Sequence, residues 1–156
     1  MDSTDAAMKR KLELVDILVE QSDYEGALSL CDEVIAESAA SFEAYSERAR
    51  IHHKLGRQSE SLRDLQTLID LRPESPTAYL RRSTLNMELG NDLLAIDDLT
   101  RVIESGEEYF LDTAYFYRAV AYLGVGDKES AMKDCQKLPR DFEFYVRTKK
   151  ELGRHL

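Results

Sequence analysis

An arginine and an aspartate recur at one fixed spacing in three segments of the chain. The pairs, each 16 residues apart, are Arg48 with Asp64, Arg82 with Asp98, and Arg118 with Asp134. A guanidinium and a carboxylate form charge-assisted hydrogen bonds, frequently two in parallel. Because the same pair recurs three times, we expect it to join elements of the fold. Direct binding of a ligand by all three pairs is the alternative.

The histidines and cysteines do not form a catalytic or metal-ligating set. His52 and His53 are adjacent, so on a helix they would point about 100° apart, with His52 on the core face. Cys31 and Cys135 occupy equivalent places in the first and last repeats described below, too far apart for a disulfide, and are expected to be reduced core residues. The chain also has no glycine-rich phosphate loop, nucleophile elbow or zinc spacing. We therefore predict no catalytic, cofactor-binding or metal site, and no enzyme.

The composition is that of a globular acidic protein with helical elements. The chain has 156 residues, a formal net charge of −9 and 43% apolar residues, with few glycines and prolines. No apolar run is long enough to span a membrane, and the first residues lack the layout of a secretory leader. An acidic surface repels phosphate backbones, so nucleic acid is not expected as a partner. These features predict a cytoplasmic, all-helical protein that is not bound to a membrane.

The charge is unevenly distributed along the sequence. Residues 1–40 carry ten acids and three bases, which is a net charge of −7. Residues 113–156 carry six acids and nine bases, which is a net charge of +3. Such an asymmetry can orient a partner or a second copy by long-range attraction, and weak self-association is one expectation. A solvated surface with a chance asymmetry is the alternative.

The arginine–aspartate pairs lie within an internal repeat of the sequence. Ala44-Tyr45 recurs as Ala78-Tyr79 and Ala114-Tyr115, at spacings of 34 and 36 residues. Apolar and small residues recur at three- and four-residue steps on both sides of a turn, which predicts a helical hairpin. The turns are expected near Ser22, Gly56, Gly90 and Gly126. A lone hairpin cannot bury its apolar face, whereas stacked hairpins share one continuous core.

This pattern resembles the tetratricopeptide repeat family. The resemblance rests on the 34-residue period, on Leu-Gly before two of the turns, on a small residue opening the second helix, and on Pro73. The usual early tryptophan is tyrosine in three repeats and Lys11 in the first. The resemblance implies an α-α superhelix, expected to form a single domain over residues 1–156. Its repeats are expected at about 8–40, 42–74, 76–108 and 112–138.

A further helix is expected after the fourth repeat. Pro139 ends the last repeat helix, and Phe142, Tyr145, Lys149 and Leu152 fall on one helical stripe. In the family, a terminal helix commonly covers the exposed core of the last repeat. We therefore predict a C-terminal capping helix over 140–153, which makes nine helices in all.

The resemblance also implies where a partner would bind, because the first helix of each repeat lines the concave surface. The positions so selected are polar in the first two repeats and apolar in the last two, and an exposed apolar strip indicates a binding surface. The predicted groove residues are Arg50, His53, Leu80, Arg81, Thr84, Met87, Phe116, Tyr117, Val120 and Leu123. Coverage of this strip by the C-terminal segment, through Phe142 or Phe144, is the alternative.

The function indicated is that of a protein-interaction scaffold that binds a protein or peptide segment in this groove. One subtype of the family grips the C-terminal carboxylate of heat-shock chaperones with basic and amide side chains. At the matching places this sequence has Leu12, Asp16, Glu47, Thr77 and Arg81, of which only Arg81 suits a carboxylate. That role is therefore disfavoured. An inhibitory binder, such as a toxin-immunity protein, and a self-associating structural unit remain alternatives.

Overall fold

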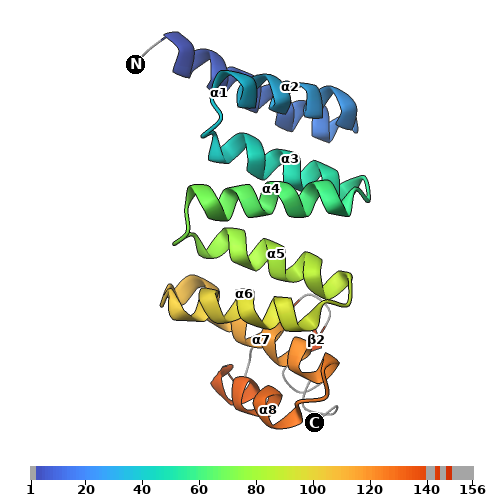
Figure 1. The fold of residues 1–156 in the computed structure, drawn as a ribbon, viewed down its shortest axis with the longest axis vertical. Helices are drawn as coiled ribbons and strands as arrows, with labels where there is room; N and C mark the ends of the chain where they lie inside the picture. Colours follow the sequence, from blue (N-terminus) through green and yellow to red (C-terminus); the bar gives the residue numbers. More distant parts are fainter. Residues whose placement is uncertain (1–2, 140–142, 145–146, 149–156) are drawn as a thin grey trace. The chain divides into compact units, whose positions relative to one another are not determined.

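The computed structural model describes residues 3–139, 143–144 and 147–148. The chain divides into two compact units, Met1–Pro73 and Glu74–Leu156. Within the described residues, the secondary structure consists of eight α-helices and two very short strands (Figure 1). Each unit is built from two helical hairpins, so the predicted all-α repeat architecture is confirmed. None of the described helices is long and apolar enough to cross a membrane.

The first unit contains four helices. They are α1 (Ser3–Glu20), α2 (Tyr24–Glu37), α3 (Phe42–Lys54) and α4 (Gln58–Leu71). Helices α1 and α2 form one hairpin and α3 and α4 the next, and α3 also contacts α1 and α2. The core of this unit is a cluster of Val15, Ala27, Leu28, Cys31 and Ile51.

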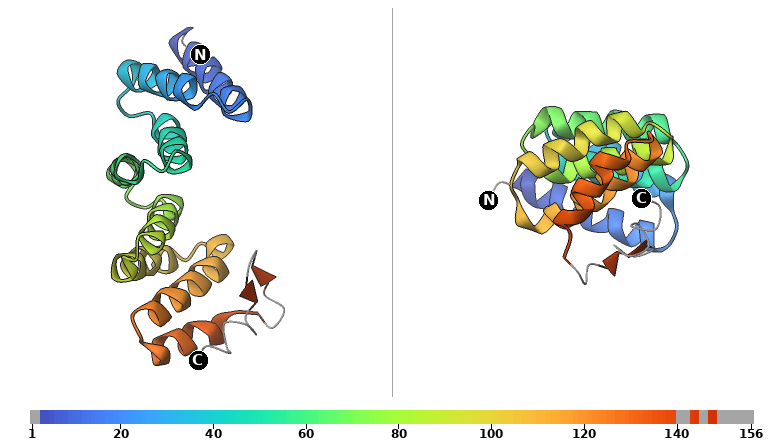
Figure 2. Two further views of the ribbon diagram at one scale, coloured as in Figure 1. Left: turned by 90° about the vertical axis from the view of Figure 1, so that its right-hand side faces the viewer. Right: turned by 90° about the horizontal axis from the view of Figure 1, so that it is seen from below.

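The second unit repeats this arrangement with four more helices. They are α5 (Pro76–Glu88), α6 (Asp92–Glu104), α7 (Glu108–Gly124) and α8 (Lys128–Lys137). Consecutive helices pack side by side, and α5 also contacts α7 (Figure 2). Alanines and the β-branched Val102 dominate the cluster between α6 and α7, which lets those helices approach closely.

The turns of all four hairpins use a left-handed residue, as the repeat predicted. Gly56 has φ 70°, and the equivalent place in the first hairpin is taken by Ser22, with φ 62°. A residue in this conformation reverses the chain after a helix, and glycine adopts it without a steric penalty. Ser22 is thus the one described non-glycine residue with a positive φ.

Two expectations about the last part of the chain need correction. Helix α7 begins at Glu108, four residues before the predicted start of the fourth repeat, because Gly106 (φ 70°) already completes the preceding turn. The predicted capping helix over 140–153 falls largely outside the described residues. At the four described positions it is wrong, since β1 (Glu143–Phe144) pairs antiparallel with β2 (Arg147–Thr148). Aromatic and β-branched residues are frequent in 142–148, and such residues favour strands over helices.

Candidate functional site

The three arginine–aspartate pairs form as predicted, each between the two helices of one hairpin. Arg48 donates from Nε to Asp64 Oδ2 at 2.9 Å and from Nη2 to Oδ1 at 2.6 Å. The pairs Arg82–Asp98 and Arg118–Asp134 repeat this two-bond geometry with distances of 2.6–2.9 Å. All three aspartates are buried. A buried carboxylate needs such a partner, so these residues join helices and are not open to a ligand.

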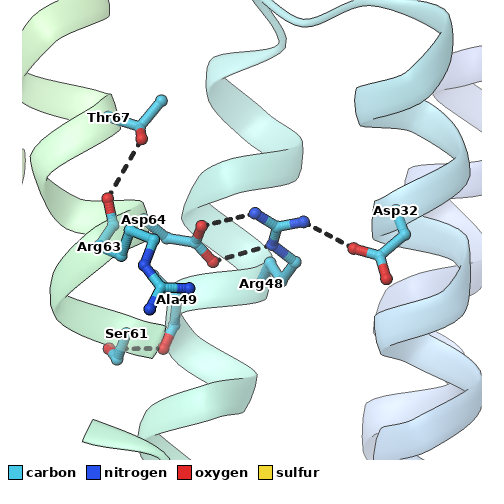
Figure 3. Close-up of polar contacts among 7 residues, drawn as sticks. All are labelled: Asp32, Arg48, Ala49, Ser61, Arg63, Asp64 and Thr67. Atoms are coloured by element: carbon cyan, nitrogen blue, oxygen red, sulfur yellow. Dashed lines mark hydrogen bonds and ion pairs between the residues drawn. The ribbon is translucent and has the colours of Figure 1, made fainter. Parts of the chain in front are cut away.

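The arginines also reach beyond their own hairpins. Arg48 lies between α4 and α2, where its Nη1 donates to Asp32 Oδ1 at 2.6 Å (Figure 3). In the second unit, Arg118 Nη1 donates to Thr100 Oγ1 on α6 at 3.0 Å. The guanidinium of Arg48 also lies 5.2 Å from the ring centroid of Tyr45, the repeat tyrosine. The arginine of the repeat therefore ties two successive hairpins together within each unit.

The first hairpin replaces the repeat tyrosine with Lys11 and uses a different connection. Lys11 Nζ donates to Glu33 Oε2 at 2.7 Å and to Glu37 Oε1 at 2.8 Å, both on α2. These acceptors raise the pKa of Lys11. The departure from the family pattern at position 11 thus substitutes an exposed ion pair for an aromatic contact.

In the first unit, the predicted groove residues lie among charges. Arg50 donates from Nε to Glu47 Oε2 at 2.8 Å, and its Nη2 lies 3.4 Å from Asp16 Oδ1 on α1. His53 is exposed at the end of α3. Because two acids already neutralise Arg50, this face offers little net positive charge to an acidic partner.

In the second unit, the predicted apolar residues gather on the first helices of the two hairpins. Leu80 and Met87 from α5 pack with Tyr117 from α7 in one cluster, and all three keep part of their surface exposed. Tyr117 also packs against a second cluster, together with Val120 and Leu123. We call these five residues the apolar face.

Phe116 does not belong to this face. Its side chain is only 4% exposed and packs in the core formed with Ala119, Ala131, Cys135 and Leu138. The register of α7 explains the correction, because Phe116 is part of the buried cluster shared with α8, whereas Tyr117 and Val120 pack at its edge and stay partly exposed. The predicted place of Phe116 in an open groove is therefore wrong.

The polar residues predicted beside the apolar face are Arg81 and Thr84. Arg81 is exposed on α5. Thr84 donates its hydroxyl to the Arg81 carbonyl at 2.8 Å, so its hydrogen is used within the helix. Tyr117 is the titratable group of the face, and burial, with a smaller effect of Glu88, raises its pKa. Its phenol therefore stays neutral at physiological pH.

The other candidate reactive groups are core residues. Burial raises the pKa of the Cys31 thiol to about 12, and both Cys31 and Cys135 are free thiols in the core. Burial lowers the pKa of His52, whose Nδ1 has no hydrogen-bond partner among the described residues. Within the same residues, no group of His, Cys, Asp and Glu could hold a metal ion.

One feature was missed by the reasoning from sequence. A cavity of about 470 Å³ opens where the turn before α6 meets the end of α7, lined by residues 90–94, Gly124 and Val125. Its signal in the sequence was the adjacent pair Leu93-Leu94, which stands outside the inward-facing stripe of α6.

Together, the repeated helical hairpins and the ion pairs between their helices define a helical-repeat fold. The sequence model of the tetratricopeptide repeat matches residues 12–76, and helical hairpins continue to residue 137. Residues 12–76 therefore match a tetratricopeptide repeat, and the fold of the two units is that of such repeats.

Part of the chain is similar in sequence to segments of two longer proteins. The chain is 34% identical over 87 residues to the protein SGT1 homolog of Oryza sativa subsp. japonica, covering 56% of this chain and 22% of that protein. It is 26% identical over 89 residues to DnaJ homolog subfamily C member 3 of Gallus gallus, covering 57% and 18%. The chain thus spans about a fifth of the length of these relatives.

Solved structures show the same fold. MamA from Desulfovibrio magneticus RS-1 superposes with a TM-score of 0.76 at 20% identity, covering 88% of this chain and 75% of that one. The first tetratricopeptide domain of Spaghetti (RPAP3), solved with the HSP90 peptide SRMEEVD, superposes with a TM-score of 0.68 at 18% identity, covering 76% and 92%. At these identities the likeness concerns the fold.

Proposed function

We propose that the chain is a non-enzymatic interaction module that binds a segment of a partner protein on the apolar face of its second unit. The observation that carries this proposal is the cluster of Leu80, Met87 and Tyr117. These side chains come from two successive first helices and remain partly exposed. A protein surface with contiguous apolar side chains and an aromatic anchor is typical of binding sites.

The proposed partner segment is extended or helical and presents apolar side chains to this face. An acidic group on the same segment would meet Arg81, which is exposed beside Leu80 on α5. A cytoplasmic setting is part of the proposal, because both buried thiols are free and suit a reducing compartment.

The experiment is affinity capture of partners by the wild-type chain and by the Tyr117→Ala/Arg81→Glu variant, compared by mass spectrometry. We expect the variant to lose the specific partner. Arg81→Glu alone should weaken capture without disturbing the core. Arg101→Glu is the matched control, since Arg101 is an exposed arginine on α6 of the same unit. Equal capture by the wild type and the double variant would reject the apolar face.

A chaperone C-terminal peptide is disfavoured as the partner. In the first unit, two of the matching positions are the acids Asp16 and Glu47, and both lie close to Arg50. They would repel a terminal carboxylate and withhold the nearby guanidinium from it. We therefore expect no heat of binding when the peptide SRMEEVD is titrated into the chain. Saturable binding of that peptide would overturn this part of the proposal.

A further inference from the structure

The cavity beside the third turn is bordered by apolar side chains that the fold does not use. Leu93 and Leu94, in the first turn of α6, are 69% and 54% exposed, and Val125 at the end of α7 is 42% exposed. The core contacts of α6 are made instead by residues such as Ala95 and Leu99. Exposing neighbouring large apolar side chains around a cavity is costly in water and indicates a binding site.

Two glycines line this cavity. Gly90 has φ 75°, and the space that a Cβ would occupy there is open. At Gly124 a Cβ would overlap the carboxylate of Asp92, so glycine leaves room for this carboxylate at the end of α7. The Asp92 carboxylate therefore lies at the wall of the cavity, beside the end of α7.

The charge around the cavity is negative. Asp92 forms no hydrogen bond or ion pair through its side chain with any residue that the structure describes. The lining contains one acid, Asp92, and no lysine or arginine. The potential at the cavity therefore favours a cation beside the apolar group.

We propose that this cavity is a second docking site, which takes a partner-protein segment whose large aliphatic or aromatic side chain is flanked by lysine or arginine. The apolar side chain enters between Leu93, Leu94 and Val125, and the flanking base pairs with Asp92. A cavity of about 470 Å³ accommodates such a side chain. The site goes beyond the proposed function, because none of its lining residues belongs to the apolar face. The cavity favours a basic group on its partner, whereas the apolar face is proposed to meet an acidic one.

The test is an NMR titration of the full ¹⁵N-labelled chain with short peptides whose ends are capped. One peptide has a central Leu-Phe flanked by lysines, a second has Ala-Ala between the same lysines, and a third has Leu-Phe flanked by glutamates. We expect the first peptide to shift the amide signals of residues 90–94 and 124–125. The other two should bind about tenfold more weakly, as expected when an anchor or a charge pair is lost.

Variants separate this site from its surroundings. Leu93→Ala/Leu94→Ala should abolish the shifts, and Asp92→Asn should weaken binding and reduce its dependence on salt. Two control variants should bind the peptide like wild type. The first is Asp97→Asn, which changes an exposed acid on the same helix. The second is Leu14→Ala/Ile17→Ala, which removes exposed apolar side chains from α1.

Three results would overturn the proposal. The first is the absence of shifts at residues 90–94 and 124–125 with the lysine-flanked Leu-Phe peptide. The second is unchanged binding by Leu93→Ala/Leu94→Ala. The third is a concentration-dependent shift of the same signals without peptide, which would assign the cavity to a second copy of this chain. Loss of the apolar face in Tyr117→Ala/Arg81→Glu should leave the peptide titration intact, so the two proposals fail separately.

Discussion

At the scale of single residues, the repeated arginines act as interhelical connectors. Each guanidinium lies in one helix and satisfies a buried carboxylate in the next, while Arg48 and Arg118 also reach the preceding hairpin. Removing one member of such a pair leaves a buried charge without a partner. The resulting loss of folding stability is larger than the net stability that the intact pair contributes. The 16-residue spacing predicted these contacts because it spans one hairpin.

The pair Arg82–Asp98 gives a direct test of this account. We expect Asp98→Ala to lower the free energy of unfolding by about 2–3 kcal/mol, because the arginine loses both of its bonds to a buried partner. Asp97→Ala, the exposed neighbour, should change it by less than about 0.5 kcal/mol. Urea denaturation measures both values, and similar losses in the two variants would contradict the assigned role.

His52 makes stability depend on pH. Burial lowers its pKa, against the opposing attraction of Asp64, with Arg48, Glu60 and Arg57 contributing less. The unfolded chain therefore binds the proton more readily, so the free energy of unfolding should fall as the pH drops below the ordinary histidine value of 6.5.

The variant His52→Phe removes this titration and the unpaired Nδ1. Between neutral pH and pH 5 it should lose less stability than the wild type, as measured by thermal or urea unfolding. Parallel losses in the two proteins would show that His52 is not the group responsible.

At the scale of elements, the sequence specified the hairpins because their signals are local. Glycine at the turns, helical periodicity and capping residues such as Ser41 and Asp127 act within a few residues of one another. The C-terminal prediction failed at its described positions because a helical stripe and a strand-forming composition coincide in 142–148. Phe116 was misplaced because burial depends on the register of α7 against α8, which the repeat pattern alone does not determine.

The first turn offers a test at this scale. Ser22 adopts φ 62°, where the other hairpins have glycine. We expect Ser22→Gly to raise the free energy of unfolding by about 0.5–1 kcal/mol, since relief of the left-handed strain exceeds the entropy of the added glycine. Gly56→Ser should lower it by a similar amount. Thermal unfolding measures both changes, and destabilisation by Ser22→Gly would contradict this interpretation of the turn.

At the scale of the whole molecule, the sequence predicts an electrostatic gradient. Its first 40 residues carry a net charge of −7 and residues 113–156 carry +3. We expect weak self-association at low ionic strength that disappears at high salt, because screening removes attraction between exposed charges. Sedimentation at several salt concentrations measures it. A monomer at every concentration and ionic strength would refute the prediction.

The repeat pattern also limits what sequence can say about the partner. Core positions such as Ala49 and Ala119 identify the fold, whereas the surface positions that select a ligand vary independently of it. The positions of the apolar face in the repeat predicted that its five residues would form one apolar strip. The cavity beside Leu93 was not predicted, because it is formed by the approach of Gly124 to Asp92.

The central claim is that the apolar face of the second unit binds a partner segment. Its most direct test is the affinity of the purified captured partner for the wild type, for Tyr117→Ala/Arg81→Glu and for the control Arg101→Glu. We expect the double variant to bind at least about thirtyfold more weakly, as for loss of an aromatic anchor and a charge contact, and the control to bind like wild type. Equal affinity of the wild type and a folded double variant would contradict the account.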